Sequence, residues 1–211
     1  MADWLNLEGK VVIVTGGASG IGNHVVSTLK DAGATPVIAD ISVETGEERD
    51  GIFCTKCDVT NKESVEAMVA AVVEKYGKLD AIVNNAGVNL PRLLVDVKGE
   101  KPEYELDEKS FNIMFNINVK GLMYCAQAAA KQMLKQGGGV IINMSSESGR
   151  KAPRGRAHTP QPRVPATASP AAGPKNLANT TSASWQWPPE SWKQPACAHL
   201  LTTKHWPIPA A

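Results

Sequence analysis

Hydrophobic positions in the first 143 residues follow two alternating patterns. Short, β-branched apolar runs predict strands, and longer stretches with apolar residues on one side predict helices. The predicted strands cover residues 10–14, 36–40, 51–57, 81–84 and 140–143; the predicted helices cover a stretch that ends near residue 32, then 61–76 and 107–136. Nearly continuous apolar strands separated by helices need cover on both faces. We therefore expect an α/β fold with a doubly wound parallel sheet.

This pattern stops near Arg150, and the composition changes at the same place. Residues 1–150 carry 15 Lys and Arg against 20 Asp and Glu, whereas residues 151–211 carry 7 against the single acid Glu190. The second segment also holds 11 of the 14 prolines and four of the five tryptophans. Because it has few Val, Ile and Phe residues to bury, we expect 151–211 to be a disordered tail behind one truncated domain, 1–150.

Composition and charge exclude several classes of function. A net charge of +1 argues against nucleic-acid binding, and no apolar run approaches the roughly 20 residues of a membrane span. Four cysteines without an apolar leader predict a reducing, cytoplasmic setting. Cys54 and Cys57 have the spacing of a metal or redox pair, but they fall in a predicted buried strand with no second ligand pair nearby. We therefore expect no metal site.

A glycine-rich turn, TGGASGIG, follows the first predicted strand. Glycines in it allow the backbone to approach a pyrophosphate, whose charge the N–H groups at the start of the helix can bind. The residues expected to bind a cofactor here are Gly16, Ser19, Gly20, Ile21 and Gly22. The alternative is an ordinary turn, but this segment follows a strand, opens a helix and is matched by an acid after the next strand.

That acid is Asp40, which lies 18 residues after Gly22. A carboxylate there can accept hydrogen bonds from both ribose hydroxyls of NAD, and it would repel the 2′-phosphate of NADP. We therefore expect NAD as the cofactor of a Rossmann-type domain. The alternative is a solvated aspartate at the end of a strand.

Together with the glycine-rich turn, four other segments resemble the short-chain dehydrogenase/reductase family over residues 1–150. They are Cys57-Asp58-Val59, Asn84-Asn85-Ala86-Gly87, Asn118-Val119-Lys120-Gly121 and Ile142-Asn143-Met144-Ser145-Ser146. The resemblance implies that Asp58 and Val59 hold the adenine, and that Asn85, Ala86 and Gly87 line the nicotinamide side. It also implies that Asn118 positions a water for proton transfer, that Ser146 hydrogen-bonds the substrate oxygen, and that the protein is a homo-oligomer.

The family's chemistry also needs a Tyr-x-x-x-Lys pair on the next helix, where the lysine lowers the pKa of the tyrosine. No such pair is present in this chain. The last tyrosine is Tyr124, and Thr159 stands 13 residues after Ser146, where the family has its tyrosine. We therefore expect the chain as written to be inactive, even if it binds NAD.

A one-nucleotide change of reading frame accounts for the missing pair. If each true codon joins the third base of one codon to the first two bases of the next, residues 151–164 can encode E-G-S-E-G-Q-S-S-Y-A-A-T-K-G. The tyrosine codon then spans His158 and Thr159, and the lysine codon spans Pro162 and Arg163. The same rule applied to residues 175–200 permits the strand motif N-I-R-V followed by P-G. We therefore expect the frame to change at Arg150, either in the gene or in its sequencing.

Such a truncation has consequences for stability and assembly. The strand at 140–143 would become an exposed edge, and the helix at 107–136, which pairs across subunits in the family, would show an uncovered apolar face. We therefore expect the homo-oligomer interface to be lost.

The segment Asn89–Leu106 is long and charged, and it resembles the members of the family that oxidise a sugar alcohol phosphate. Arg92, Lys98 or Lys101 could bind a phosphate there; the alternative is a solvated loop of mixed charge.

Three hypotheses remain open. The first is an NAD-dependent oxidoreductase acting on a polyol phosphate or another alcohol, which is active if its frame is restored. The second is a damaged, non-catalytic dinucleotide-binding module. The third is a docking role for the proline-rich tail, whose Trp187-Pro188-Pro189 segment can adopt a polyproline II helix.

Overall fold

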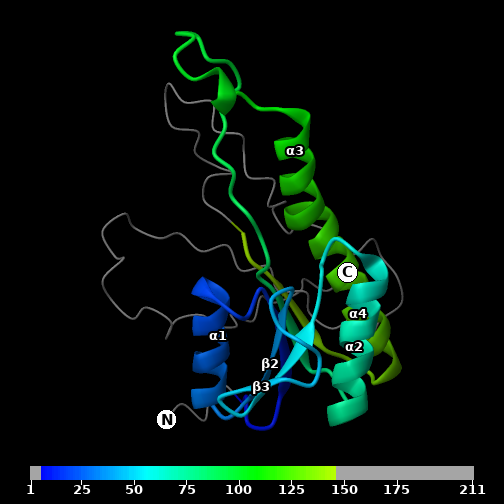
Figure 1. Ribbon diagram of the computed structural model, residues 1–211. Coiled ribbons are helices and arrows are strands. Elements are labelled where there is room, and N and C mark those ends of the chain that lie inside the picture. Colours follow the sequence, from blue (N-terminus) through cyan, green and yellow to red (C-terminus); the bar gives the residue numbers. More distant parts are fainter. Residues whose placement is uncertain (1–5, 146–211) are drawn as a thin grey trace, which may run out of the picture.

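The computed structural model describes residues 6–145, and these form one twisted sheet with helices on both faces (Figure 1). The strands are β1 (Val11–Thr15), β2 (Thr35–Asp40), β3 (Glu48–Arg49), β4 (Ile52–Lys56), β5 (Ala81–Asn84) and β6 (Val140–Asn143). Their order is β3-β4-β2-β1-β5-β6, and every pairing is parallel except that of β3 with β4. Ser146 and the tail, with the disorder, docking role and frame change expected for it, lie outside the described residues.

The helices divide between the two faces of the sheet. They are α1 (Gly20–Asp31), α2 (Lys62–Tyr76), the short 3₁₀ turn η2 (Pro102–Tyr104), α3 (Glu108–Phe115), the π-helical turn η3 (Asn116–Gly121) and α4 (Leu122–Lys135). In Figure 1, α1 lies on one side of the sheet and α2 and α4 lie on the other. The parallel sheet and its two helical layers confirm the expected fold class.

Two buried clusters hold these layers to the sheet. On one face, Val26 and Leu29 of α1 belong to a cluster with Val12 and Val14 of β1. On the other face, α2 and α4 share a larger cluster with β1, β2, β4 and β5, which includes the fully buried residues Ile13, Val65, Met68, Val72, Leu79, Ile82 and Ala129. All five residues of β1 are buried because this strand lies at the centre of the sheet and is covered on both sides.

Two predicted elements were wrong in detail. The expected strand 51–57 is a shorter strand, β4, preceded by the antiparallel strand β3. Asp50 and Gly51 join them with positive φ angles of 52° and 70°, the backbone that a two-residue hairpin turn requires. The expected helix 107–136 is interrupted by η3, where wider π-helical turns replace the α-helical ones.

The segment between β5 and α3 extends beyond the carboxyl ends of the strands (Figure 1). A β-bridge between Leu93 and Glu105 and a hydrogen bond of 2.6 Å from the N–H of Asp96 to the carboxylate of Glu105 join its two sides. On the neighbouring α3, the side chains of Phe111 and Phe115 are 47% and 41% exposed, and their rings stack with centroids 6.0 Å apart. Within residues 6–145, β6 pairs with β5 alone.

An acid before β5 joins two segments that are distant in sequence. The carboxylate of Asp80 accepts hydrogen bonds from the N–H of Val11 at 2.9 Å and from Lys10 at 3.3 Å, and it lies 2.8 Å from the Nζ of Lys78. Burial raises the pKa of Asp80, but the bonds from Lys78, Val11 and Lys10 outweigh burial and hold the pKa below its ordinary value.

We therefore predict an acid-dependent loss of stability that involves Asp80. Because its pKa is lower in the folded state, its contribution is present above the unfolded pKa of about 4 and is lost as the pH falls through the folded pKa. Asp80→Asn should lower the free energy of unfolding at pH 7 and flatten its decline below about pH 5, measured by urea unfolding followed by circular dichroism. The exposed Asp31→Asn is the control, and identical curves for Asp80→Asn and the unchanged chain would contradict the prediction.

Candidate functional site

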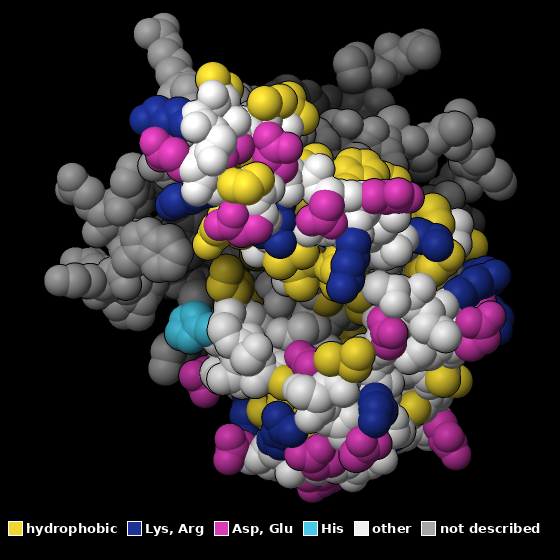
Figure 2. Space-filling view, turned by 45° about the horizontal axis from the view of Figure 1, so that its top comes forward, with side chains coloured by type: hydrophobic (Ala, Val, Ile, Leu, Met, Phe, Trp, Pro, Cys, Tyr) yellow, Lys and Arg dark blue, Asp and Glu magenta, His cyan; other side chains and the backbone are white. Residues whose placement is uncertain are grey.

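A cleft of about 410 Å³ opens at the carboxyl ends of β1, β2, β4 and β5. This edge of a doubly wound sheet is where such folds bind ligands. The cleft is lined by Gly16, Ser19, Gly20, Ile21, Asp40, Ile41, Cys57, Asp58, Val59, Asn85, Ala86, Gly87, Val88 and Ile117. It thus brings together ten of the eleven residues expected to bind the cofactor, from four separate segments of the chain. Figure 2 looks down on this end of the molecule, where the surface is hollowed near its centre.

The glycine-rich turn is shaped for a close-lying anion. Gly16 and Gly20 have φ angles of +65° and +54°, which other residues rarely adopt. A side chain on Gly20 would meet nothing within 4 Å, so the space beside it is open to a ligand. Ser19 precedes α1 without capping it through its side chain. The first N–H groups of the helix therefore remain available to a pyrophosphate, and these residues fit a dinucleotide.

Gly22, the eleventh expected residue, does not line the cleft. A Cβ atom there would collide with the carbonyl oxygen of Gly16 and stand 2.6 Å from the Nδ2 of Asn85. Its missing side chain allows α1 to begin directly against the turn. Gly22 thus shapes the cleft from behind.

Thr15, at the end of β1, is a functional residue that sequence analysis missed. Its buried hydroxyl oxygen accepts hydrogen bonds from the N–H groups of Asn85 at 3.0 Å and Ala86 at 3.1 Å. In return, the side-chain amide of Asn85 donates to the carbonyls of Thr15 at 3.1 Å and Gly16 at 3.3 Å. These bonds join the glycine-rich turn to the segment after β5, so the two walls of the cleft are held together.

Asp40 is held in place at the end of β2. One carboxylate oxygen accepts from the N–H of Ala18 at 3.2 Å, and the other accepts from the N–H and hydroxyl of Ser42 at 3.0 and 2.8 Å. The carboxylate therefore faces the cleft in a defined orientation beside the glycine-rich turn. Its ability to accept further hydrogen bonds fits a ribose diol.

Asp58 and Val59 form the wall at the end of β4. Thr60 donates two hydrogen bonds to one oxygen of Asp58, at 2.9 Å from its N–H and 2.7 Å from its hydroxyl. Val59 packs closely over Gly121, where a Cβ atom would stand 2.8 Å from its side chain. A larger residue at Gly121 would push Val59 toward the cleft, which explains the glycine at the end of η3.

Asn118 lies in η3 and is 2% exposed. Its amide accepts a hydrogen bond from the N–H of Val88 and donates one to the carbonyl of Val88, both at 2.8 Å. The side chain thus anchors the segment that follows Gly87. An amide can make a further hydrogen bond at each of these atoms, so the role of Asn118 in positioning a water stays a prediction.

Four lining residues were not expected: Ile41, Cys57, Val88 and Ile117. Cys57 belongs to the quoted segment Cys57-Asp58-Val59, and the other three directly follow or precede motif residues, so adjacency to the motifs was the signal available in the sequence. Burial raises the pKa of Cys57 to about 12 and also raises that of Cys54, so both thiols stay protonated at neutral pH. Within residues 6–145, no three His, Cys, Asp or Glu side chains are grouped to hold a metal, and no helix is long and apolar enough to cross a membrane.

The sheet order and the cleft define a Rossmann-type dinucleotide-binding domain. The chain belongs to the short chain dehydrogenase family, which matches residues 10–158. It is 44% identical over 157 residues to sorbitol-6-phosphate 2-dehydrogenase of Klebsiella pneumoniae, covering 74% of this chain and 59% of that protein. It is 37% identical to 3beta-hydroxysteroid dehydrogenase 2 of Eggerthella lenta, covering 71% of this chain and 58% of that protein.

The crystal structure of gox2181 is similar to this fold, with a TM-score of 0.62 and 30% identity over 74% of this chain and 61% of that one. The chain thus spans about three fifths of the length of these relatives. Members of this family are oxidoreductases that typically use NAD or NADP.

The role of Thr15 leads to a prediction. Thr15→Val preserves shape but leaves the N–H of Ala86 without its acceptor, so unfolding free energy should fall by about 1–3 kcal/mol. Thr55→Val is the matched control, because this buried strand threonine makes one long contact, 3.4 Å to the hydroxyl of Thr45. Urea unfolding measures both variants. An equal loss of unfolding free energy in both variants would show that the hydrogen bonds of the Thr15 hydroxyl do not stabilise the fold more than those of Thr55.

Proposed function

We propose that this chain derives from an NAD-dependent oxidoreductase of a sugar alcohol phosphate and that, as written, it binds NAD without turning over substrate. The observation that carries the proposal is the cleft itself. At the glycine-rich turn the first N–H groups of α1 are not capped by a side chain, and at the end of the next strand the carboxylate of Asp40 is held in place. These are the two groups that recognise a pyrophosphate and its adjoining ribose.

The charge of the cleft favours NAD over NADP. None of the described residues that line it is Lys or Arg, and Asp40 stands where the adenosine ribose would lie. The 2′-phosphate of NADP would meet a carboxylate with no cation in the lining, whereas the ribose hydroxyls of NAD would donate hydrogen bonds to it. Repulsion and unsatisfied phosphate oxygens both disfavour NADP.

The other lining residues would contact different parts of the cofactor. The second carboxylate oxygen of Asp58 accepts no hydrogen bond within residues 6–145 and would accept one from the adenine amine, while Val59 would pack against the ring. Asn85, Ala86 and Gly87 would border the nicotinamide end. Bound NAD would supply the hydride acceptor. These residues bind and orient it, and none of them takes the hydroxyl proton.

That proton requires groups beyond the described residues. Ser146 would hydrogen-bond the reacting oxygen, and a tyrosine with a neighbouring lysine would accept the proton. The chain as written has no Tyr-x-x-x-Lys after Ser146. We propose that the pair was lost in the frame change at Arg150, so the chain as written is a non-catalytic dinucleotide-binding module.

The proposed substrate is sorbitol 6-phosphate, oxidised at C2 to fructose 6-phosphate in the cytoplasm. Its support is the 44% identity to sorbitol-6-phosphate 2-dehydrogenase together with the long charged segment between β5 and α3. Another alcohol remains the alternative, since a hydroxysteroid dehydrogenase is 37% identical.

The cofactor proposal predicts a change in preference on mutation of Asp40. The unchanged chain should bind NADH roughly tenfold or more tightly than NADPH, since hydrogen bonds to a charged group contribute about 1.5–3 kcal/mol. Asp40→Asn should weaken NADH binding and narrow the difference, measured by titrating nucleotide fluorescence. Glu44→Gln, an exposed neighbour paired with Lys56 at 2.6 Å, is the control. Tighter binding of NADPH by the unchanged chain would refute the choice of NAD.

The substrate proposal is tested by restoring the frame. A gene shifted after the Arg150 codon should encode a protein that reduces NAD with sorbitol 6-phosphate, detected by NADH absorbance. The chain as written should be slower by at least about 10²–10⁴-fold, the usual contribution of general acid–base catalysis. A restored chain with phenylalanine in place of the new tyrosine is the control. Turnover by the chain as written would overturn the proposed inactivity.

A further inference from the structure

Arg92, in the segment between β5 and α3, is a cation with few hydrogen-bond partners. Its side chain is 24% exposed, and its Nε is buried without an acceptor. Nη1 donates to the carbonyl of the adjoining Pro91 at 3.0 Å, and Nη2 donates to no residue between 6 and 145. Leaving a charged donor unsatisfied costs free energy, so this guanidinium still has capacity for an anion.

The nearest acid does not use that capacity. Asp107 lies 3.8 Å from the Nε of Arg92, which is too far for a hydrogen bond. Both oxygens of Asp107 already accept from Ser110 at 2.7 Å, one from its N–H and the other from its hydroxyl, because Asp107 caps α3. Asp107 therefore orients the guanidinium by charge and leaves its hydrogen bonds free.

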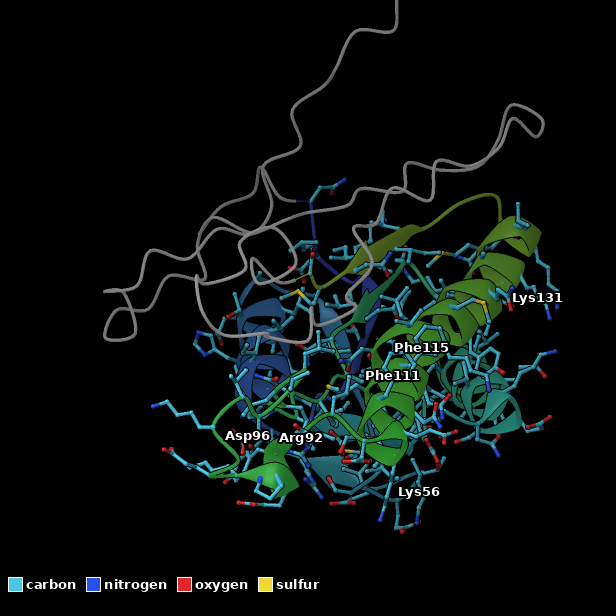
Figure 3. The ribbon with its side chains drawn as sticks, turned by 90° about the horizontal axis from the view of Figure 1, so that it is seen from above. Lys56, Arg92, Asp96, Phe111, Phe115 and Lys131 are labelled. Carbon is cyan, nitrogen blue, oxygen red and sulfur yellow. The ribbon has the colours of Figure 1, made fainter. Side chains whose placement is uncertain are left out.

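Arg92 lies on the segment that leaves the cleft at its nicotinamide end. Val88 lines the cleft and is fixed by both polar atoms of Asn118, and Arg92 follows four residues later. Figure 3 shows Arg92 between the outer part of this segment, marked by Asp96, and the start of the helix that carries Phe111. Four residues span at most about 14 Å, which limits how far the backbone of Arg92 can lie from Val88 at the nicotinamide end of the cleft.

We infer that Arg92 binds the phosphate of the substrate, an inference that rests on the proposed function. A hexitol 6-phosphate carries its phosphate at the far end of the carbon chain from C2. A site for it must therefore stand outward from the reacting end of the cleft, and Arg92 lies on the segment that leaves the cleft there after Val88. The planar guanidinium can donate two parallel hydrogen bonds to phosphate oxygens, and partial burial keeps it oriented and poorly screened.

The two lysines of the same segment are poorer candidates. Lys98 and Lys101 are exposed, and Lys101 lies over the ring of Tyr104 at 5.8 Å from its centroid. Exposed ammonium groups on flexible stems lose much of their attraction to screening and side-chain entropy. They therefore supply a matched control, being cations of the same segment without a fixed geometry.

The test measures binding of sorbitol 6-phosphate, inorganic phosphate and sorbitol by calorimetry to the full chain saturated with NADH. Arg92→Gln should weaken binding of both phosphates roughly 10- to 100-fold and leave sorbitol unchanged, because the lost bonds are charge-assisted. Lys98→Gln should change all three by less than about threefold. In the frame-restored protein, Arg92→Gln should raise KM for sorbitol 6-phosphate and leave kcat unchanged.

A second variant tests the sign of the local charge. Asp107→Asn keeps a good helix cap but removes the negative charge beside the guanidinium, so binding of the phosphates should tighten several-fold. If the Arg92–Asp107 pair had only a structural role, Asp107→Asn would weaken phosphate binding or leave it unchanged. Circular dichroism confirms that both variants are folded.

The outcomes separate this inference from the proposed function. If NADH binds and Arg92→Gln leaves the phosphate affinities unchanged, or if Lys98→Gln has the larger effect, the role of Arg92 is overturned while NAD binding stands. If NADH does not bind the unchanged chain, the proposed function fails first. If the restored protein oxidises another alcohol and binds no phosphate, both the substrate and the role of Arg92 are refuted.

Discussion

The cleft depends on the link between Thr15 and Asn85. The hydroxyl of Thr15 accepts the backbone N–H groups that follow β5, and the amide of Asn85 returns hydrogen bonds to the carbonyls of the glycine-rich turn. Two strands that are 70 residues apart in sequence are therefore joined at the point where both leave the sheet. Because the turn cannot move independently of the opposite wall, the first N–H groups of α1 point into a space of fixed shape.

The same principle of anchoring by backbone hydrogen bonds extends outward from this link. Asn118 holds Val88 through both of its amide atoms, and it can do so because the π-helical turn η3 breaks the regular spacing of the long helix. Ser42 and Ala18 hold the carboxylate of Asp40 at the other end of the cleft. Each anchor orients a group toward the cleft while its own polar atoms are satisfied, so the shape of the cleft does not depend on a ligand.

Much of the fold was predictable because its strands are short, apolar and clearly separated. Strands 81–84 and 140–143 were placed correctly to the residue, and α2 was placed to within one residue at its start. The hairpin at Asp50 and Gly51 was missed, although Asp-Gly is a recognised turn signal, because the apolar run that follows it dominated the interpretation. The π-helical turn could not be predicted, since a single inserted residue barely disturbs a helical pattern over thirty positions.

The sequence by itself determined the family, the order of the elements, and the residue types that a dinucleotide requires at the ends of β1, β2, β4 and β5. It also determined that residues after Arg150 do not continue the pattern, because composition is a property of the chain alone, whereas the change of reading frame stays a prediction. Only the tertiary structure decided that ten predicted residues share one cleft while Gly22 lies behind it, that Thr15 joins the walls, and that Arg92 keeps unused donors. Those facts depend on distances between segments that no local pattern encodes.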